Sequence, residues 1–143
     1  MITIPNNLSF NEINIGDKFT FTKIFTFEDG LNFASISGNM NQLHINEKND
    51  YAINSSFKDI IVYGMLTASL FSTLFGMYSP GKKSLCLYQT LEFRNPLYYG
   101  EEVVVIGEVI AKYNSINTLK YKTLIMKDKI IIISGEAKVK VLD

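Results

Sequence analysis

His44 is the only histidine among the 143 residues, and its imidazole is suited to proton transfer near neutral pH. It follows an uncharged stretch, GNMNQL, at residues 38–43. Here it could take a proton from a water molecule or return one to a substrate. A lone histidine is often structural, so the residue alone leaves both interpretations open.

A second candidate group is the backbone N–H of Gly64. Residues 60–80 carry no charge, and residues 64–77 are rich in Leu, Met, Phe and Ala without an internal proline, which predicts a helix that begins at Gly64. The first N–H groups of a helix have no partner within it, and the helix dipole favours negative charge there. Because glycine has no side chain, a ligand could approach this N–H and place an oxyanion on it. The alternative is a glycine that only lets the loop enter the helix.

The predicted helix at 64–77 is apolar nearly all round, as in helices that are buried or that span a membrane. Roughly fourteen residues cover ~21 Å, less than the ~30 Å of a hydrocarbon core, so we expect a buried helix. Gly64, Ala68, Ser72 and Gly76 recur every fourth residue and form a stripe of small side chains. Against this stripe we expect either the concave face of a sheet or a ligand along the helix.

Most of the remaining chain is predicted to form strands. Apolar residues alternate with polar or β-branched ones, and turn residues separate the runs. The last three runs are joined by short turns, which is typical of an antiparallel meander. The predicted strands cover residues 18–26, 85–93, 102–113, 118–126 and 130–142.

Two short helices are predicted before the apolar one. Thr26 and Asp29 resemble a capping box, so a helix should begin there and stop at Gly38. Asn46 predicts another cap, followed by one or two helical turns up to Ile53.

Composition restricts the class of protein. The chain is 47% hydrophobic and 20% charged, as in one globular domain spanning residues 1–143. Fourteen basic and fourteen acidic residues give zero net charge, so nothing favours nucleic acid or an anionic membrane as a partner. Cys86 is the only cysteine, which excludes an internal disulfide and a cysteine metal site, and we expect it in the core. The N-terminus lacks the regions of a signal peptide, which predicts a cytoplasmic protein.

These elements together predict the fold class. A helix that is apolar on every side needs cover on every side. A curled antiparallel sheet supplies part of that cover, and a partner subunit can supply the remainder. We therefore expect an α+β domain whose sheet wraps around one long central helix.

Residues 37–46, SGNMNQLHIN, resemble the signature S-G-D-x-N-P-x-H-x-D, and residues 61–66, IVYGML, resemble I-A/V-H-G-M-L. Shorter matches continue at 68–72, 80–81, 89–93 and 96–101. These blocks are similar to those of the MaoC-like (R)-specific enoyl-CoA hydratases, which have the hotdog fold. The resemblance runs from Ile15 to the C-terminus and is more specific for the fold than for the activity.

The resemblance implies roles for four positions. Asn39 and His44 occupy the places of the Asp and His that handle the water and the proton added across the 2,3 double bond. The Gly64 N–H would bind the thioester carbonyl, and Ser72 would line the site. The resemblance also implies a homodimer whose sheets join edge to edge, and no cofactor beyond the coenzyme A or carrier protein of the substrate.

Several positions depart from the family pattern. Asn39 replaces Asp, Tyr63 replaces a histidine next to the substrate-binding glycine, and Gln42 replaces Pro, whereas Asn41 keeps the residue that shapes the turn. We expect Tyr63 and Asn41 to belong to the substrate-binding site. An amide cannot accept a proton as a carboxylate does, but it can orient a water or an imidazole. Because loss of a general base costs ~10²- to 10⁴-fold in rate, we expect hydratase activity to be weakened or altered.

Three functions are therefore open. The first is an (R)-specific hydratase or 3-hydroxyacyl-CoA dehydratase. The second is a thioesterase of the same fold that uses His44 with a positioned water. The third is a catalytically silent subunit that binds acyl thioesters or pairs with an active paralogue as a heterodimer.

Overall fold

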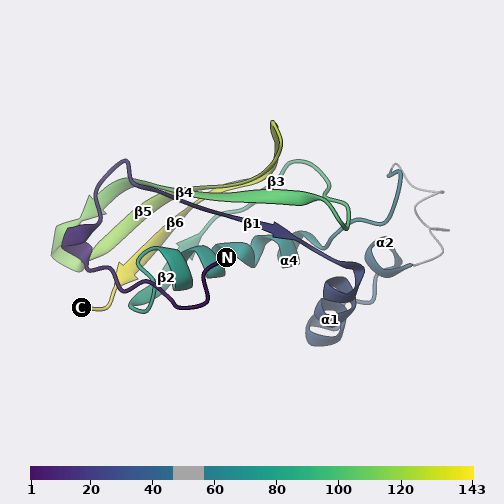
Figure 1. Cartoon of the computed structure of the whole chain (residues 1–143), viewed down its shortest axis with the longest axis horizontal. Helices are drawn as coiled ribbons and strands as arrows, with labels where there is room; N and C mark the ends of the chain where they lie inside the picture. Colours follow the sequence, from purple (N-terminus) through teal and green to yellow (C-terminus); the bar gives the residue numbers. More distant parts are fainter. Residues whose placement is uncertain (47–56) are drawn as a thin grey trace.

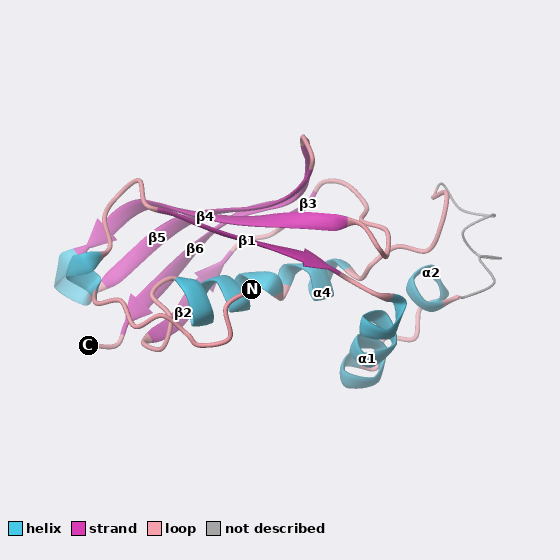
Figure 2. Ribbon diagram, viewed as in Figure 1, coloured by secondary structure: helices cyan, strands magenta, loops and turns pink. Residues whose placement is uncertain are grey.

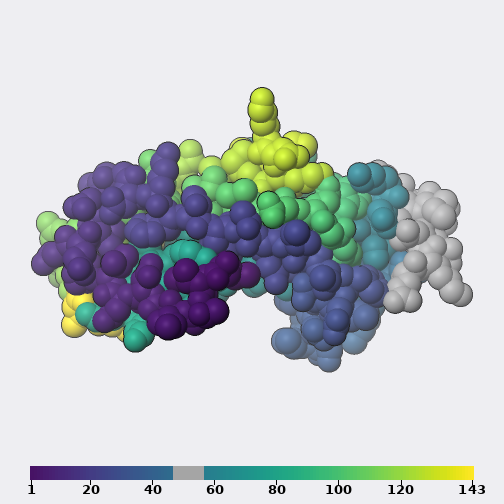
Figure 3. Space-filling view, in the orientation of Figure 1, coloured from purple at the N-terminus to yellow at the C-terminus, as the bar shows by residue number. Residues whose placement is uncertain are grey.

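The computed structural model describes residues 1–46 and 57–143. Six antiparallel strands form one sheet in the order β1-β4-β5-β6-β2, and β3 pairs with β6 (Figure 1). The β5–β6 hairpin bends away from the rest of the sheet (Figures 1 and 3). The strands are β1 (Lys18–Ile24), β2 (Ser84–Gln89), β3 (Glu92–Phe93), β4 (Glu102–Tyr113), β5 (Thr118–Lys127) and β6 (Ile130–Val141).

The meander β4-β5-β6 confirms the prediction for the C-terminal half. Ala137, Val139 and Val141 of β6 alternate into the core, as expected from the sequence. The strand predicted at 85–93 is divided into β2 and β3, because residues 90 and 91 are not part of either strand. Thr90 approaches Gly135 of β6 so closely that a Cβ there would lie 1.9 Å from the Thr90 carbonyl oxygen.

The predicted apolar helix is present, and it lies across one face of the sheet (Figure 2). It comprises α4 (Gly64–Ala68), α5 (Leu70–Thr73) and a π-helical turn, η2 (Leu74–Tyr78). It is interrupted at Ser69, whose side-chain hydroxyl donates to the Leu66 carbonyl at 2.6 Å and so competes with the helical backbone bonds.

One side of this helix packs on the sheet and the other side is open. Leu70, Phe71, Leu74 and Phe75 are buried, and Leu74 fits against Gly107 of β4, where a Cβ would lie 2.6 Å from it. Met65 is 58% exposed, and Ser69 and Ser72 are exposed as well. The stripe of small residues borders an open groove of about 440 Å³ between the helix and β2, lined by Met65, Ala68, Ser69, Phe71, Ser72, Phe75, Gly76, Ser84, Leu85, Cys86, Gln89 and Leu91.

The expectation that Cys86 lies in the core is wrong, because its side chain is exposed. The register between β2 and β6 shifts between Cys86 and Tyr88, which disrupts the alternation of inward and outward residues. The strand β2 is also an edge strand of the sheet, so neighbouring Leu85 and Leu87 are exposed too.

The predicted capping box is confirmed at the start of α1 (Phe27–Ser37). The Thr26 hydroxyl accepts from the Asp29 N–H at 3.2 Å, and the Asp29 carboxylate accepts from the Thr26 N–H at 2.9 Å. This cap ends β1 at Ile24, two residues before the predicted end. The helix stops at Gly38, which has the left-handed φ of 78°.

A short helix, α2 (Gln42–Ile45), follows α1. The helical turns predicted after Asn46 lie outside the described residues. Single 3₁₀ turns occur at η1 (Phe10–Glu12) and η3 (Asn114–Ile116). In the described ranges, no helix has the length and hydropathy needed to cross a membrane. Figure 1 shows α1 and α2 beyond the end of the central helix where α4 begins, and this arrangement places the site.

Candidate active site

Two successive asparagine turns connect α1 to α2 and present His44. The side-chain oxygen of Asn39 accepts from the Asn41 N–H at 3.1 Å, and that of Asn41 accepts from the Leu43 N–H at 3.0 Å. Asn41 thereby caps α2 and satisfies one of its free N–H groups. Because each turn fixes the next, the uncharged stretch seen in the sequence is an ordered support for His44.

His44 is half-buried, and its Nδ1 lies 2.8 Å from the Ile61 carbonyl oxygen. A carbonyl can only accept a hydrogen bond, so Nδ1 carries the hydrogen and Nε2 keeps its lone pair. Burial lowers the pKa of His44, and the bond to Ile61 partly opposes that shift. The imidazole is therefore neutral at pH 7 and able to accept a proton at Nε2.

The backbone of His44 is held from two directions. Its N–H donates to the Asn41 carbonyl at 3.0 Å, and its carbonyl accepts from the Tyr99 hydroxyl at 3.1 Å. Burial, followed by the nearby Tyr63 and Asp29, raises the pKa of Tyr99 to about 12, so this phenol remains a donor. These bonds fix the position from which the imidazole extends.

Tyr63 packs directly on the imidazole. Its ring is stacked on His44 with centroids 4.0 Å apart and planes at 27°, and its hydroxyl donates to the Asn39 carbonyl at 2.5 Å. Burial raises the pKa of the Tyr63 phenol, which keeps this donor protonated. The residue that replaces the family's histidine is thus in contact with both candidate catalytic positions.

Gly64 follows Tyr63 as the first residue of α4. A Cβ at this position would lie 2.8 Å from Cε1 of Phe93, so only glycine fits beneath that ring without displacing it. The close contact explains why a glycine is required here, and it leaves the N–H at the helix start as the candidate oxyanion donor.

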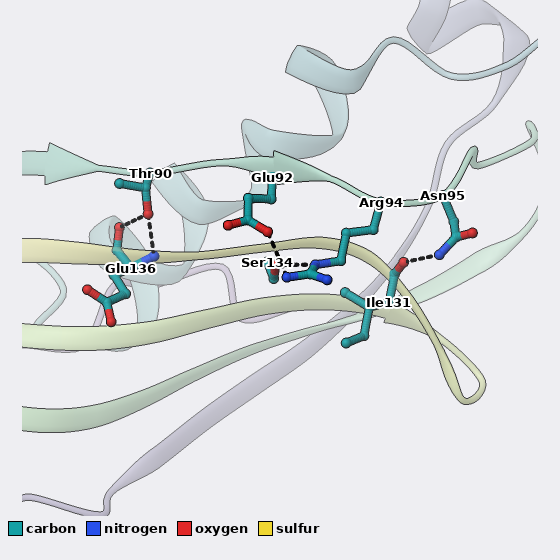
Figure 4. A network of polar contacts seen from close by, with 7 residues as sticks. All are labelled: Thr90, Glu92, Arg94, Asn95, Ile131, Ser134 and Glu136. Carbon is teal, nitrogen blue, oxygen red and sulfur yellow. Dashed lines mark hydrogen bonds and ion pairs between the residues drawn. The ribbon is translucent and has the colours of Figure 1, made fainter.

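Side chains on both sides of Phe93 bond to one another and to β6 (Figure 4). Arg94 donates to Ser134 at 2.7 Å and to Glu92 at 2.6 Å, and Asn95 donates to the Ile131 carbonyl at 2.7 Å. These bonds tie the two-residue strand to β6. Arg94 therefore has a structural role within the described part of the chain.

The functional residues surround one open cavity of about 340 Å³. It is lined by Phe33, Ser37, Asn39, His44, Tyr63, Gly64, Met65 and Phe93. The structure thus brings together Asn39, His44, Tyr63 and Gly64 of the predicted set. Of the described residues that line this cavity, His44 is the one that titrates near neutral pH, and none of them is a carboxylate.

Two predicted residues lie outside the cavity, and other residues that line it were not predicted. Asn41 caps α2 behind His44, and Ser72 lines the groove beside β2, which joins the cavity region at Met65. Ser37, Met65 and Phe93 fall inside the blocks that carry the family resemblance, and this could have identified them. Phe33, one helical turn before Ser37 on α1, lies outside those blocks.

Comparison with known proteins identifies the family of this chain. Residues 11–128 match the family described as MaoC like domain, and the chain belongs to that family. The (R)-specific enoyl-CoA hydratase of Aeromonas caviae is 36% identical over 135 residues, which cover 93% of this chain and 98% of that protein. The mitochondrial 3-hydroxyacyl-[acyl-carrier-protein] dehydratase of Arabidopsis thaliana is 30% identical over 129 residues, 87% of this chain and 75% of that protein.

Solved structures of hydratases also align with this chain over most of its length. The (R)-hydratase structure from A. caviae aligns with a TM-score of 0.86 and 35% identity over 90% of this chain and 97% of the other. An unliganded R-hydratase from Pseudomonas aeruginosa aligns with a TM-score of 0.90 and 28% identity over 97% and 88%. The expected family and the hotdog fold are confirmed.

The burial of His44 predicts the pH at which its imidazole takes up a proton. Because His44 is the only histidine, its imidazole gives a single set of NMR signals, and we expect a midpoint below about 6.5, the ordinary histidine value. The unfolded chain then binds this proton more readily than the folded one, so the stability that depends on His44 is lost as pH falls below about 6.5. A midpoint at or above 6.5 would contradict the burial described here.

Proposed function

We propose that this protein is an (R)-specific enoyl-thioester hydratase that also catalyses the reverse dehydration of 3-hydroxyacyl thioesters. The observation that supports this most is the cavity that His44, with its neutral imidazole, and Gly64, at the start of α4, both line. Hydration of an enoyl thioester needs a base for water and a donor for the carbonyl oxygen. Relatives are named for both coenzyme A and carrier-protein substrates, so we propose an acyl thioester of either carrier.

In the proposed reaction, the Gly64 N–H binds the thioester carbonyl oxygen. As the water oxygen bonds to C3, its proton passes to Nε2 of His44. The electron pair of the double bond moves through C2 onto the carbonyl oxygen, where the Gly64 N–H stabilises the enolate. His44 then returns the proton to C2, and the thioester is restored with one water added.

The same imidazole must act as base and as acid, because Asn39 cannot replace the carboxylate of the family motif. Its amide oxygen already accepts from the Asn41 N–H, and an amide has no ionised form near neutral pH. Its NH₂ group can still donate to a water or to the 3-hydroxyl group. We infer that Asn39 orients the water and that His44 carries the proton.

The acyl chain is proposed to lie in the groove beside β2. This groove has apolar walls that include Phe71, Phe75 and Leu91, with Ser72 on the helix side. Met65 lines both the groove and the catalytic cavity, so a chain that leaves the cavity along the helix enters the groove. Burial of hydrocarbon there contributes about 0.8 kcal/mol per CH₂.

The alternatives are not favoured. The relatives that cover most of this chain are named hydratases and dehydratases, which argues against a thioesterase and against a silent subunit. We also propose that the reaction needs no cofactor beyond the carrier of the thioester and that the protein works in the cytoplasm.

The function is tested by an assay of the purified protein with crotonyl-CoA. The assay follows the absorbance of the double bond and the release of free thiol together. We expect loss of the double bond without thiol release, an (R)-3-hydroxy product, and at least a ~10²-fold lower rate in His44→Ala. Thiol release would show a thioesterase. No turnover of crotonyl-CoA or of crotonyl carrier protein would show a silent subunit.

Asn39→Asp should increase the hydration rate at least ~10²-fold, because it adds the missing base next to an intact His44 and Gly64. The substitution is nearly isosteric, and Oδ can still accept from the Asn41 N–H. His44→Ala in the same chain should abolish the gain, since residues that act as a unit are not additive. Gln42→Glu is the matched control, as it adds a charge on exposed α2 outside the cavity and should give no such gain.

An unchanged rate in Asn39→Asp would show that the cavity differs from that of the family by more than one side chain. A natural protein that is already as fast as its hydratase relatives would show that the carboxylate is dispensable.

We propose that the protein is a homodimer joined through the β2 edge. Within residues 1–46 and 57–143, this edge lacks a strand partner, and it carries exposed apolar residues, among them Leu87 at 56% exposure, beside the open face of the central helix. A second copy that pairs there would extend the sheet and cover that face. A heterodimer with a paralogue would use the same edge.

Sedimentation should therefore show a dimer at micromolar concentration. Leu87→Lys should shift it toward monomer, since a charged edge residue opposes strand pairing. Ile36→Lys, at an exposed apolar residue of α1, should leave the dimer intact. A natural protein that sediments as a folded monomer would refute this interface.

A further inference from the structure

Tyr63 is buried, with 2% of its surface exposed, and it is in contact with three parts of the site. Its ring stacks on the His44 imidazole, and its hydroxyl bonds to the Asn39 carbonyl. Its own carbonyl accepts from the Thr67 N–H at 3.0 Å and from the Thr67 hydroxyl at 3.1 Å, and it directly precedes Gly64. One side chain and its backbone thus connect the base, the asparagine loop and the oxyanion donor.

We propose that Tyr63 is a positioning residue that sets the plane of the His44 ring and fixes His44 and Asn39 relative to the Gly64 N–H. This inference rests on the proposed hydratase function for its rate consequences. It assigns Tyr63 a role different from the substrate contact expected at this position, because its hydroxyl is already bonded to the protein.

The stacked Tyr63 ring restrains the tilt of the imidazole, which the hydrogen bonds of His44 do not. The hydrogen bond from Nδ1 to the Ile61 carbonyl fixes one atom of the imidazole, and the ring could still tilt about that atom. A ring stacked at 4.0 Å and 27° opposes the tilt on one face. Phe33 in turn packs on Tyr63, with centroids 4.9 Å apart, so Tyr63 itself is confined. Catalytic groups need to be held within about 10–20° of the productive geometry.

The phenol also leaves the proton chemistry to His44 alone. Among the described residues, the Tyr63 ring stacks on the imidazole and the Ile61 carbonyl bonds to its Nδ1, and the Tyr99 phenol bonds to the His44 backbone. Burial raises the pKa of both phenols, so neither titrates near neutral pH. The pKa of His44 is set by burial and by the bond to Ile61, without a contribution from a charged side chain in the described ranges.

Three variants test the proposal. Tyr63→Phe keeps the stacked ring and removes only the bond to Asn39, whereas Tyr63→Leu removes both restraints. Tyr121→Phe is the matched control, because it also deletes a buried tyrosine hydroxyl, one that bonds to Ser79 at 2.9 Å in the core away from the cavity. The measurements are kcat and KM with crotonyl-CoA, thermal unfolding, and the NMR titration of His44.

We expect Tyr63→Phe to lower kcat by about 3- to 10-fold with little change in KM. His44 should titrate in this variant at the same pH as in the natural protein. Tyr63→Leu should lower kcat by ~10²-fold and shift the His44 midpoint upward, since the imidazole becomes more exposed to water. Tyr121→Phe should lower the unfolding temperature while leaving kcat and the His44 titration unchanged.

The proposal is overturned if Tyr63→Leu has the same kcat and the same His44 midpoint as the control variant Tyr121→Phe. Tyr63 would then contribute only to stability. Should Tyr63→Leu not fold, Tyr63→Phe decides: an unchanged kcat together with unchanged amide exchange at Asn39 and Asn41 overturns it. The titration and the exchange need no substrate. A natural protein without hydratase activity would thus refute the function, while the NMR measurements still report on the positioning.

Discussion

The hydrogen bond between His44 Nδ1 and the Ile61 carbonyl is the interaction on which the site depends. It joins the loop after α1 to the segment that leads into α4, and a backbone bond from the Ile61 N–H to the Leu43 carbonyl at 3.1 Å reinforces it. The same bond selects the tautomer, since it places the hydrogen on Nδ1 and leaves Nε2 as an acceptor. The tautomer of His44 and its place beside the segment that leads into α4 therefore follow from one contact, and the stacked Tyr63 ring adds the restraint on the ring plane.

This constraint explains how the site can do acid–base chemistry although the described residues that line its cavity include no carboxylate. An imidazole that is neutral at pH 7 and held at a fixed angle can take a proton from water and return it, provided that the developing charge is stabilised elsewhere. The start of α4 supplies that stabilisation at Gly64, and Phe93, held by the Arg94 contacts to β6, packs against it. The sheet thus positions the oxyanion donor, and the asparagine turns position the base.

Local rules predicted much of this arrangement from the sequence. The capping box at Thr26 and Asp29, the end of α1 at Gly38 and the three-strand meander each depend on residues close in sequence. The exposed Cys86 could not be predicted, because a register shift in β2 disrupts the alternation. The contact of Phe93 with Gly64 and the bond from Tyr63 to Asn39 join segments 29 and 24 residues apart, and no local pattern encodes them.

The central claim is that His44 and the Gly64 N–H act on one thioester in the cavity between α2 and α4. A crystal structure of the protein with bound (R)-3-hydroxybutyryl-CoA tests it most directly. The account predicts the thioester oxygen about 2.7–3.1 Å from the Gly64 nitrogen, with the 3-hydroxyl group within hydrogen-bond distance of His44 Nε2. A thioester bound elsewhere, or one whose C3 lies out of reach of His44, would contradict it.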